Sequence, residues 1–271
     1  MPSIKDTKCI LIIGSTAGLG RALALSILAL PSKPTVIVCG RRQERIDELI
    51  AVHGTDGRLK GFKLDLLADR ASLKASIAEI VQQYPQLDAV MFMSGIQHEF
   101  NFTEPESVDL DKVADELNTN YLSIINAITL FLPQLIKIGV TGYPSFIYTV
   151  TSGLGVVPGA WVPNYCATKA ALHSLSLTLN AQLKSKNVHV VEILPPLVES
   201  ELHDHQGKRE VLSKFWMPLD EFTALTIEAL KSDDVQIPIG SSVADYEGFE
   251  KGKLEAVTKM YDGRKAATGG K

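Results

Sequence analysis

Short apolar runs alternate with helical patterns along most of the chain. The first run, residues 9–13, is continuous and ends in a glycine-rich turn, which is typical of a strand covered on both faces. Similar runs predict further strands at 35–39, 59–64, 88–93, 145–151, 188–194 and 235–239. The segments between them predict helices at 18–30, 43–52, 68–83, 108–137, 163–186 and 219–230.

This regular alternation of strand and helix predicts an α/β fold. We expect a Rossmann-type doubly wound parallel sheet of about seven strands, with helices on both faces and ligands at the carboxyl ends of the strands. A chain of 271 residues with 45% hydrophobic content fits a single domain, residues 1–271.

Two segments depart from the alternation. The stretch 196–218 holds charges, two histidines and the aromatic pair Phe215 and Trp216, so we interpret it as a loop with short helices that can close over a ligand. The tail 268–271 is rich in glycine, and we expect it to be frayed.

Composition narrows the class of protein. The formal charge of −4 gives no basic excess, so nucleic acid is not an expected partner. The three cysteines, Cys9, Cys39 and Cys166, lack disulfide and zinc spacing, which indicates a reducing compartment. The longest apolar stretch, 22–30, is too short to span a bilayer. We therefore expect a cytoplasmic protein with no membrane partner.

A metal site is not predicted either. His203 and His205 flank Asp204, but no third ligand is apparent.

The turn after the first strand carries the first candidate chemistry. Glycines let the chain turn tightly and let backbone N–H groups approach a pyrophosphate at the start of a helix. The pattern alone also fits an ordinary strand-to-helix turn, but its position after the first buried strand favours a dinucleotide. The predicted cofactor contacts in this turn are Gly14, Ser15, Thr16, Gly18, Leu19 and Gly20.

The end of the second strand indicates which dinucleotide binds. An acidic residue there bonds the ribose hydroxyls of NAD(H), whereas an arginine accepts the 2′-phosphate of NADP(H). Here Arg41 and Arg42 follow the strand, and no carboxylate occurs before Glu44. The sequence therefore favours NADP(H) over NAD(H), because the guanidinium fork suits phosphate. The alternative is that both arginines only begin a solvated helix.

The next two strand ends supply further candidates. Asp65, with Leu66 beside it, could accept from the adenine amino group, or it could cap the helix that begins near Asp69. Ser94 and Gly95 end the fourth strand, and the glycine allows close approach to the adenosine ribose.

A tyrosine and a lysine stand at helical spacing in the second half of the chain. Tyr165 and Lys169 are four residues apart, so a helix places them on one face. An adjacent ammonium favours the phenolate and makes the pair a usable proton relay. Ser152 ends the strand 145–151, and the loop to Tyr165 is long enough to return its hydroxyl to the phenol. Thr151 is a neighbouring alternative that we take as structural.

Together these motifs resemble the classical short-chain dehydrogenase/reductase family over about residues 8–240. The family's glycine motif and active-site residues match Gly14, Gly18, Gly20, Ser152, Tyr165 and Lys169. Its asparagine, which holds a water linking the lysine to solvent, matches Asn120, with Asn118 as a competing candidate. Segments 162–173 and 192–198 resemble the DltE-like subgroup, which indicates no firm substrate.

Three positions depart from the family pattern. Ile13 replaces a threonine before Gly14, and the segment 92–95 replaces Asn-Asn-Ala-Gly. Pro196 stands where the family has a glycine whose backbone meets the nicotinamide carboxamide. The resemblance still implies cofactor contacts by Pro195 and Val198 on either side of it.

The resemblance implies an NADP(H)-dependent oxidoreductase acting on a carbonyl or alcohol. Ser152 would polarise the carbonyl, Tyr165 would donate the proton, and Lys169 would lower the tyrosine pKa and hold the nicotinamide ribose. A non-catalytic dinucleotide-sensing or scaffold protein on this fold, or an isomerase using bound cofactor, are the alternatives.

Substrate and assembly are indicated only broadly. Phe215, Trp216 and Met217 suggest an apolar lid and a hydrophobic ketone or aldehyde, although the same residues could pack a core or a subunit contact. Two apolar faces on the helix around 117–135 predict a homo-oligomer, because one face remains after the other packs on the sheet. In this family such helices usually pair between subunits, which implies a homodimer or homotetramer.

Overall fold

The seven strands form one parallel sheet. The computed structural model describes residues 2–269, with every side chain except those at 205 and 206. The strand order is β3-β2-β1-β4-β5-β6-β7, which confirms the predicted Rossmann-type doubly wound sheet. The strands are β1 (Cys9–Ile13), β2 (Thr35–Gly40), β3 (Leu59–Lys63), β4 (Ala89–Phe92), β5 (Ser145–Val150), β6 (Val188–Leu194) and β7 (Gln236–Pro238).

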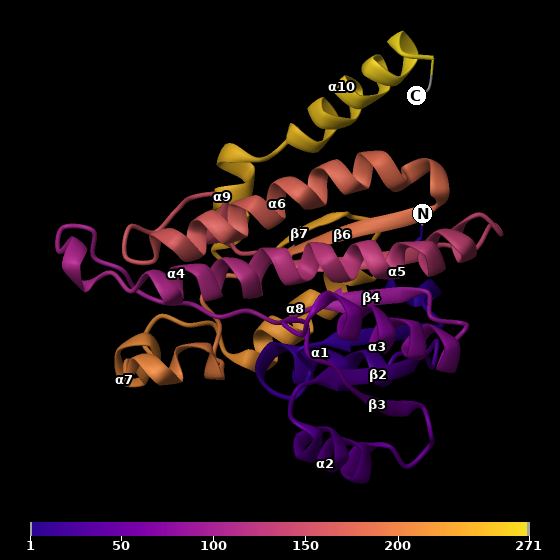
Figure 1. Cartoon of the computed structure of the whole chain (residues 1–271), viewed down its shortest axis with the longest axis horizontal. Coiled ribbons are helices and arrows are strands. Elements are labelled where there is room, and N and C mark those ends of the chain that lie inside the picture. The colour runs from indigo at the N-terminus through magenta and orange to yellow at the C-terminus, as the bar shows by residue number, and fades with distance from the viewer. Residues whose placement is uncertain (1, 270–271) are drawn as a thin grey trace.

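Helices cover both faces of this sheet (Figure 1). On one face, α1 (Gly18–Leu28), α2 (Gln43–His53) and α8 (Leu219–Leu230) pack on one set of alternate strand residues, such as Ile10 and Ile12. On the other, α3 (Arg70–Gln83), α5 (Ser123–Gly139) and α6 (Pro163–Leu183) pack on the intervening set, such as Leu11 and Ile13. The strands read as continuous apolar runs because both faces are buried.

The predicted helix 108–137 is divided by a change of winding. After α4 (Leu110–Leu117) the chain makes a π-helical turn, η3 (Asn118–Leu122), and then continues as α5. Such turns are uncommon and are often found at functional sites. This one contains Asn120.

The run Leu110–Gly139 is long and apolar enough to cross a membrane by length and composition, a test that core helices also pass. Of its apolar window, 44% is buried in the protein.

The segment 196–218 contains short helices, as predicted: η6 (Glu201–Gln206) and α7 (Arg209–Leu212). Shorter turns are η1 (Ile4–Asp6), η2 (Pro105–Ser107), η4 (Gly153–Gly155) and η5 (Lys184–Lys186). We call the segment 196–218 the lid.

Two helices after β7 were not predicted. These are α9 (Ser242–Phe249) and α10 (Lys253–Ala267), and Figure 1 shows α10 projecting from the body of the molecule. Helix thus continues almost to the predicted frayed tail, whose last residues, Gly270 and Lys271, lie outside the described residues.

Candidate active site

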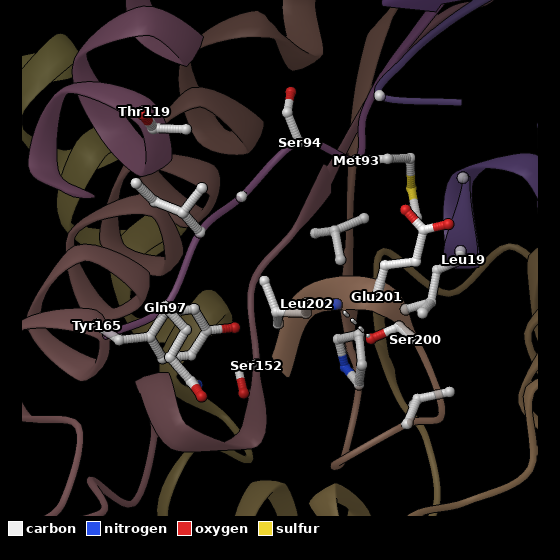
Figure 2. A pocket seen from close by; sticks show the side chains of 18 of the residues that line it. Leu19, Met93, Ser94, Gln97, Thr119, Ser152, Tyr165, Ser200, Glu201 and Leu202 are labelled. Atoms are coloured by element: carbon white, nitrogen blue, oxygen red, sulfur yellow. Dashed lines mark hydrogen bonds between the residues drawn. The ribbon is translucent and has the colours of Figure 1, made fainter. Parts of the chain in front are cut away.

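A large cavity opens at the carboxyl ends of the strands. It has a volume of about 1040 Å³ and is lined by residues that follow β1 to β6, together with part of the lid. Its centre lies where β1 and β4 are neighbours, the point at which the strand order reverses. This is the position at which doubly wound sheets bind ligands. Figure 2 shows the side chains that face this cavity.

The glycine turn forms one wall and requires glycine for reasons of space. Gly14 has a φ of +88°, and a Cβ on it would lie 2.7 Å from the backbone nitrogen of Ser94. A Cβ on Gly20 would lie 2.3 Å from the carbonyl oxygen of Gly14. Glycine at these positions therefore lets the turn pack closely against the chain after β4 and against the start of α1. A tight turn that leads into a helix N-terminus is the arrangement that suits a phosphate.

Of the residues predicted in this turn, Ser15 is the exception. It does not line the cavity, whereas Thr16, Gly18 and Leu19 do. Its hydroxyl donates to the carbonyl of Ile12 at 2.7 Å and accepts from the amide of Cys39 at 2.8 Å. Ser15 is fully buried, so its side chain joins β1 to β2 beneath the turn.

The two arginines after β2 both line the cavity. Arg42 Nη2 donates to Thr16 Oγ1 at 3.0 Å, and its Nη1 lies 3.7 Å from Glu201 of the lid. Arg45, one turn later on α2, donates to the same carboxylate at 3.0 Å. A lid carboxylate thus lies close to the arginine predicted to bind a 2′-phosphate.

Asp65 and Leu66 also line the cavity, beside the glycine turn. The Asp65 carboxylate accepts from the backbone amide of Leu67 at 3.0 Å, which closes a turn after β3. The cap of α3 is Asp69, whose carboxylate accepts from Ala71 and Ser72. The alternative reading of Asp65 as a helix cap is therefore wrong.

The chain after β6 crosses the cavity from the opposite side. Pro195, Pro196 and Val198 line it, and Val198 pairs with Met217 in an isolated parallel bridge that ties the two ends of the lid together. Ser200 comes close to the glycine turn, since a Cβ on Gly18 would lie 3.6 Å from Ser200 Cβ. The lid therefore lies over the place where the turn would hold a phosphate.

The serine and tyrosine meet at the inner end of the cavity. Ser152 follows β5 and Tyr165 lies in the first turn of α6, and Figure 2 shows both hydroxyl oxygens turned into the same space. Burial raises the pKa of Tyr165 well above its ordinary value, and its hydrogen bond with the Ser152 hydroxyl only partly opposes this. Lys169, which the sequence suggests lowers this pKa, is not among the groups that shift it here.

Lys169 and Asn120 lie close together near Tyr165, on either side of Gly95. The Lys169 ammonium donates to the carbonyl of Val150 at 2.9 Å and lies 5.5 Å from the centre of the Tyr165 ring. Burial lowers the pKa of Lys169 to about 8, although the charge of Glu116 acts in the opposite direction. A Cβ on Gly95 would lie 3.4 Å from Asn120 Oδ1 and 3.6 Å from Lys169 Nζ, so both groups flank this glycine.

Asn120 is fully buried, whereas Asn118 is exposed. The Asn120 amide accepts from Ile96 N and donates to Ile96 O, both at 2.9 Å, and donates to Thr168 Oγ1 at 3.1 Å. It thereby holds the chain after β4 against α6, the helix that carries Tyr165. This geometry favours Asn120 over Asn118 as the family's asparagine.

Sequence reasoning missed a buried carboxylate one helical turn before Asn120. Glu116 is fully buried, accepts from the amide of His98 at 2.7 Å, and accepts from the side-chain amide of Asn164 at 2.6 Å. Burial raises the pKa of Glu116, and these hydrogen bonds and the charge of Lys169 act against the rise.

Further cavity residues come from segments that the sequence analysis did not single out. Gln97 follows β4, Trp161 precedes α6, and Ser242 and Asp245 belong to α9. The available signal for the last two was their position after the carboxyl end of β7, because ligands bind at that edge of a parallel sheet. Of the predicted apolar lid residues, Phe215 lines the cavity, whereas Trp216 and Met217 do not.

Comparison with known proteins supports the same reading of the fold. Residues 8–211 match the family model described as short chain dehydrogenase. The chain is 34% identical over 235 residues to the uncharacterized oxidoreductase DltE of Bacillus subtilis (strain 168), covering 84% of this chain and 86% of that protein. It is 27% identical over 251 residues to the 3-oxoacyl-[acyl-carrier-protein] reductase FabG of Staphylococcus aureus (strain Mu50 / ATCC 700699), covering 89% and 97%.

Solved structures share the architecture. The Pseudomonas aeruginosa RhlG/NADP active-site complex superposes with a TM-score of 0.76 at 21% identity and covers 88% of this chain and 97% of its own. The 3-ketoacyl-(acyl-carrier-protein) reductase of Brucella melitensis, complexed with NADH, gives a TM-score of 0.74 at 17% identity and covers 86% and 96%. At these identities the likeness shows the fold alone.

Proposed function

Because this chain belongs to the short-chain dehydrogenase family of oxidoreductases, we propose that it transfers hydride between NADP(H) and a carbonyl or alcohol substrate. The observation that carries the proposal is the meeting of Ser152, Tyr165 and Lys169 in one cavity with the glycine turn. We take residues 1–271 as one catalytic unit and the lid as its closing segment.

A nicotinamide dinucleotide fits the described residues. A Cβ on Gly14 or Gly20 would collide with backbone, so glycine at these positions permits the tight turn that presents the N-terminus of α1 to a pyrophosphate. Thr16, Leu19, Leu66, Ser94 and Val198 line the groove that leads from this turn to Tyr165. When bound, the cofactor supplies the hydride.

Side chains of the protein supply the proton that the reduction requires. Ser152 donates a hydrogen bond to the substrate carbonyl oxygen, and Tyr165, kept protonated by its burial, donates the proton to that oxygen. The Lys169 ammonium stabilises the phenolate that is left, and Asn120 fixes the chain beside it. Oxidation of an alcohol follows the same path in reverse, with Tyr165 as the base.

The preference for NADP(H) rests on Arg41 and Arg42. Both line the cavity at the end of β2. Glu44, the first carboxylate after this strand, does not line it. A guanidinium beside Thr16 suits a 2′-phosphate.

The substrate is proposed to be a hydrophobic ketone or aldehyde. Leu154, Trp161, Leu212 and Phe215 line the cavity beyond the catalytic hydroxyls. The experiment that tests this proposal is a screen of carbonyl compounds, in which the fall of NADPH absorbance measures turnover. NADPH oxidation that depends on the ketone supports the proposal, and its absence across aromatic and aliphatic ketones and aldehydes contradicts it.

We also propose a cytoplasmic homo-oligomer, either a dimer or a tetramer. One face of α5 packs on the sheet through Ile124, Ile128 and Phe131, while Leu122 just before it is 41% exposed. Pairing of this exposed apolar surface between subunits would remove it from water. Light scattering at micromolar concentration tests the proposal, and a monomeric mass contradicts it.

A further inference from the structure

Helix α9 places two polar side chains directly against the loop of the active-site serine. Gly153 follows Ser152, and a Cβ built on it would lie 2.4 Å from Ser242 Oγ and 3.1 Å from Asp245 Oδ2. Position 153 therefore has no room for a side chain, and the serine loop packs directly against these two groups. Ser242 and Asp245 both line the cavity that holds Ser152 and Tyr165.

Neither the Ser242 hydroxyl nor the Asp245 carboxylate has a hydrogen-bond or ion-pair partner among the described residues. Ser242 is 1% exposed, and its hydroxyl has no hydrogen-bond partner among residues 2–269. Within the same described part of the chain, the Asp245 carboxylate forms no hydrogen bond or ion pair. Buried polar groups are normally satisfied, so the unpaired Ser242 hydroxyl beside a catalytic site indicates a ligand group that pairs with it. The half-buried Asp245 carboxylate lies beside this hydroxyl and can accept from the same group.

Neither side chain has a role in beginning its own helix. Ser241 occupies the cap position of α9, and no side chain caps the helix there. Asp245 lies in the first turn of α9 but accepts from none of its backbone amides. Helix capping therefore does not explain why these two residues face the cavity.

The charges around the cavity restrict the ligand group further. Among the described lining residues, Arg41 and Arg42 lie at the end of β2 and Lys169 lies behind Tyr165. The carboxylates that line the cavity are Asp65, Glu99, Asp115, Glu201 and Asp245. Of these, Glu99 pairs with Lys208 and Glu201 lies beside Arg42, whereas Asp245 has no cationic partner among the described residues. A carboxylate on the substrate would meet like charge at Asp245, whereas a hydrogen-bond donor would be bound.

Resting on the proposed function, we infer that the substrate carries a hydrogen-bond donor, a hydroxyl or an ammonium group, near the reacting carbonyl, and that Asp245 and Ser242 bind it. The substrate class is then a hydroxy ketone or an amino ketone. Hydride adds to the carbonyl carbon, the proton of Tyr165 goes to the carbonyl oxygen, and the product is a diol or an amino alcohol. NADPH is oxidised to NADP⁺, and Tyr165 regains a proton from solvent.

Gln97 completes this side of the cavity. It is 6% exposed and lines the same cavity as Tyr165 and Ser152 (Figure 2). The backbone amides of its neighbours Ile96 and His98 donate to Asn120 and Glu116, so the backbone is held on both sides of Gln97. An amide there can accept from or donate to a second polar group of the substrate.

A matched series of four ketones tests the inference with the NADPH-loaded enzyme. The series is methyl phenyl ketone, hydroxymethyl phenyl ketone, aminomethyl phenyl ketone and phenylglyoxylate, which differ only in the group beside the carbonyl. We expect kcat/KM for the hydroxyl or the ammonium compound to exceed that for the methyl compound by about tenfold or more. The carboxylate compound should be the poorest of the four.

Two variants separate the possible donors. If the donor is an ammonium, Asp245→Asn and Asp245→Ala both remove the preference over the methyl ketone, because both remove the negative charge. If it is a hydroxyl, Asp245→Ala removes the preference and Asp245→Asn retains much of it, because an amide oxygen still accepts. Glu247→Gln is the matched control, since this carboxylate is exposed on the same helix α9 and does not line the cavity. It should leave the preference unchanged.

The outcomes distinguish this inference from the proposed function. Reduction of all four ketones with kcat/KM equal within about twofold overturns the inference and leaves the oxidoreductase in place. A preference that survives Asp245→Ala also overturns it. If no ketone is reduced, calorimetry with the corresponding alcohols and the NADP⁺-loaded protein gives the same comparison, and tighter binding of the diol or amino alcohol supports the donor site. Equal or absent binding of these alcohols overturns the inference.

Discussion

The carboxylate of Glu116 accepts a hydrogen bond of 2.6 Å from the side chain of Asn164, the residue that precedes Tyr165. Through its other oxygen it holds His98, on the chain that follows β4. A fully buried carboxylate is costly unless hydrogen bonds and a nearby cation compensate for lost hydration. Here the nearby cation is Lys169, so the charge of Glu116 is linked to the protonation of the active site.

Replacing Glu116 by Gln should move the loss of activity at high pH to lower pH. Ketone reduction requires a protonated Tyr165 and a cationic Lys169, and the negative charge of Glu116 raises the pKa of both. Activity present below these pKa values is lost as pH rises through them. The pH profile of kcat/KM measures the shift.

The control for this experiment is Asp115→Asn, which removes an exposed charge next to Glu116 in sequence and should leave the profile in place. A Glu116→Gln profile that coincides with that of the wild type, with the protein folded, would show that the carboxylate is only structural.

Arg42→Ala should weaken the binding of NADPH much more than that of NADH. The guanidinium at the end of β2 is the proposed partner of the 2′-phosphate, and a charge-assisted hydrogen bond of this kind contributes about 1.5–3 kcal/mol, or roughly tenfold to a hundredfold in affinity. Titration of each dinucleotide by fluorescence measures the change.

Arg45→Ala is the matched control, because Arg45 also pairs with Glu201 but does not line the cavity. Equal losses for NADPH and NADH in Arg42→Ala would contradict the assignment of the phosphate site. Turnover that is faster with NADH in the wild type would contradict the preference itself.

His173 should make the stability of the protein fall as pH rises above the ordinary histidine pKa. Its Nδ1 lies 2.8 Å from Glu192 and its Nε2 lies 2.8 Å from Glu250, which joins α6 to β6 and to the segment before α10. Burial favours the neutral ring, but the hydrogen bonds and charges of both glutamates outweigh it and raise the pKa of His173.

A raised folded-state pKa fixes the direction of the effect. The stabilisation is fully present below the ordinary histidine pKa of about 6.5 and is lost as pH rises through the higher folded value. Melting temperatures measured across this range should fall for the wild type and should fall less for His173→Gln. In His189→Gln, which removes a histidine whose pKa burial lowers, the alkaline loss should persist. Parallel curves for the wild type and His173→Gln would contradict the prediction.

Much of the sheet and of its catalytic edge could be predicted from the sequence. The strands are covered on both faces, so they appear as continuous apolar runs, and the glycine turn is required by contacts within a short stretch of chain. That Tyr165 and Lys169 share one face of a helix follows from their spacing, but their catalytic role does not. Their meeting with Ser152 required the family resemblance, because the return of that loop depends on distant packing.

What the sequence did not reveal depends on contacts between distant segments. Glu116 looks like a surface charge on a helix and is buried only because α6 and the chain after β4 close over it. Ser15 looks like part of a phosphate loop, yet its hydroxyl bonds β1 and β2. Helix α10 buries no residue, so it has little of the apolar periodicity on which a helix prediction depends.

Turnover by Tyr165→Phe tests the central claim most directly. The variant keeps the ring in its buried site and removes only the hydroxyl that donates the proton, while Tyr143→Phe, at an exposed position, serves as the control. We predict that NADPH-dependent carbonyl reduction falls by about 10²-fold or more in Tyr165→Phe, with NADPH binding retained. Full turnover in that variant would contradict the account.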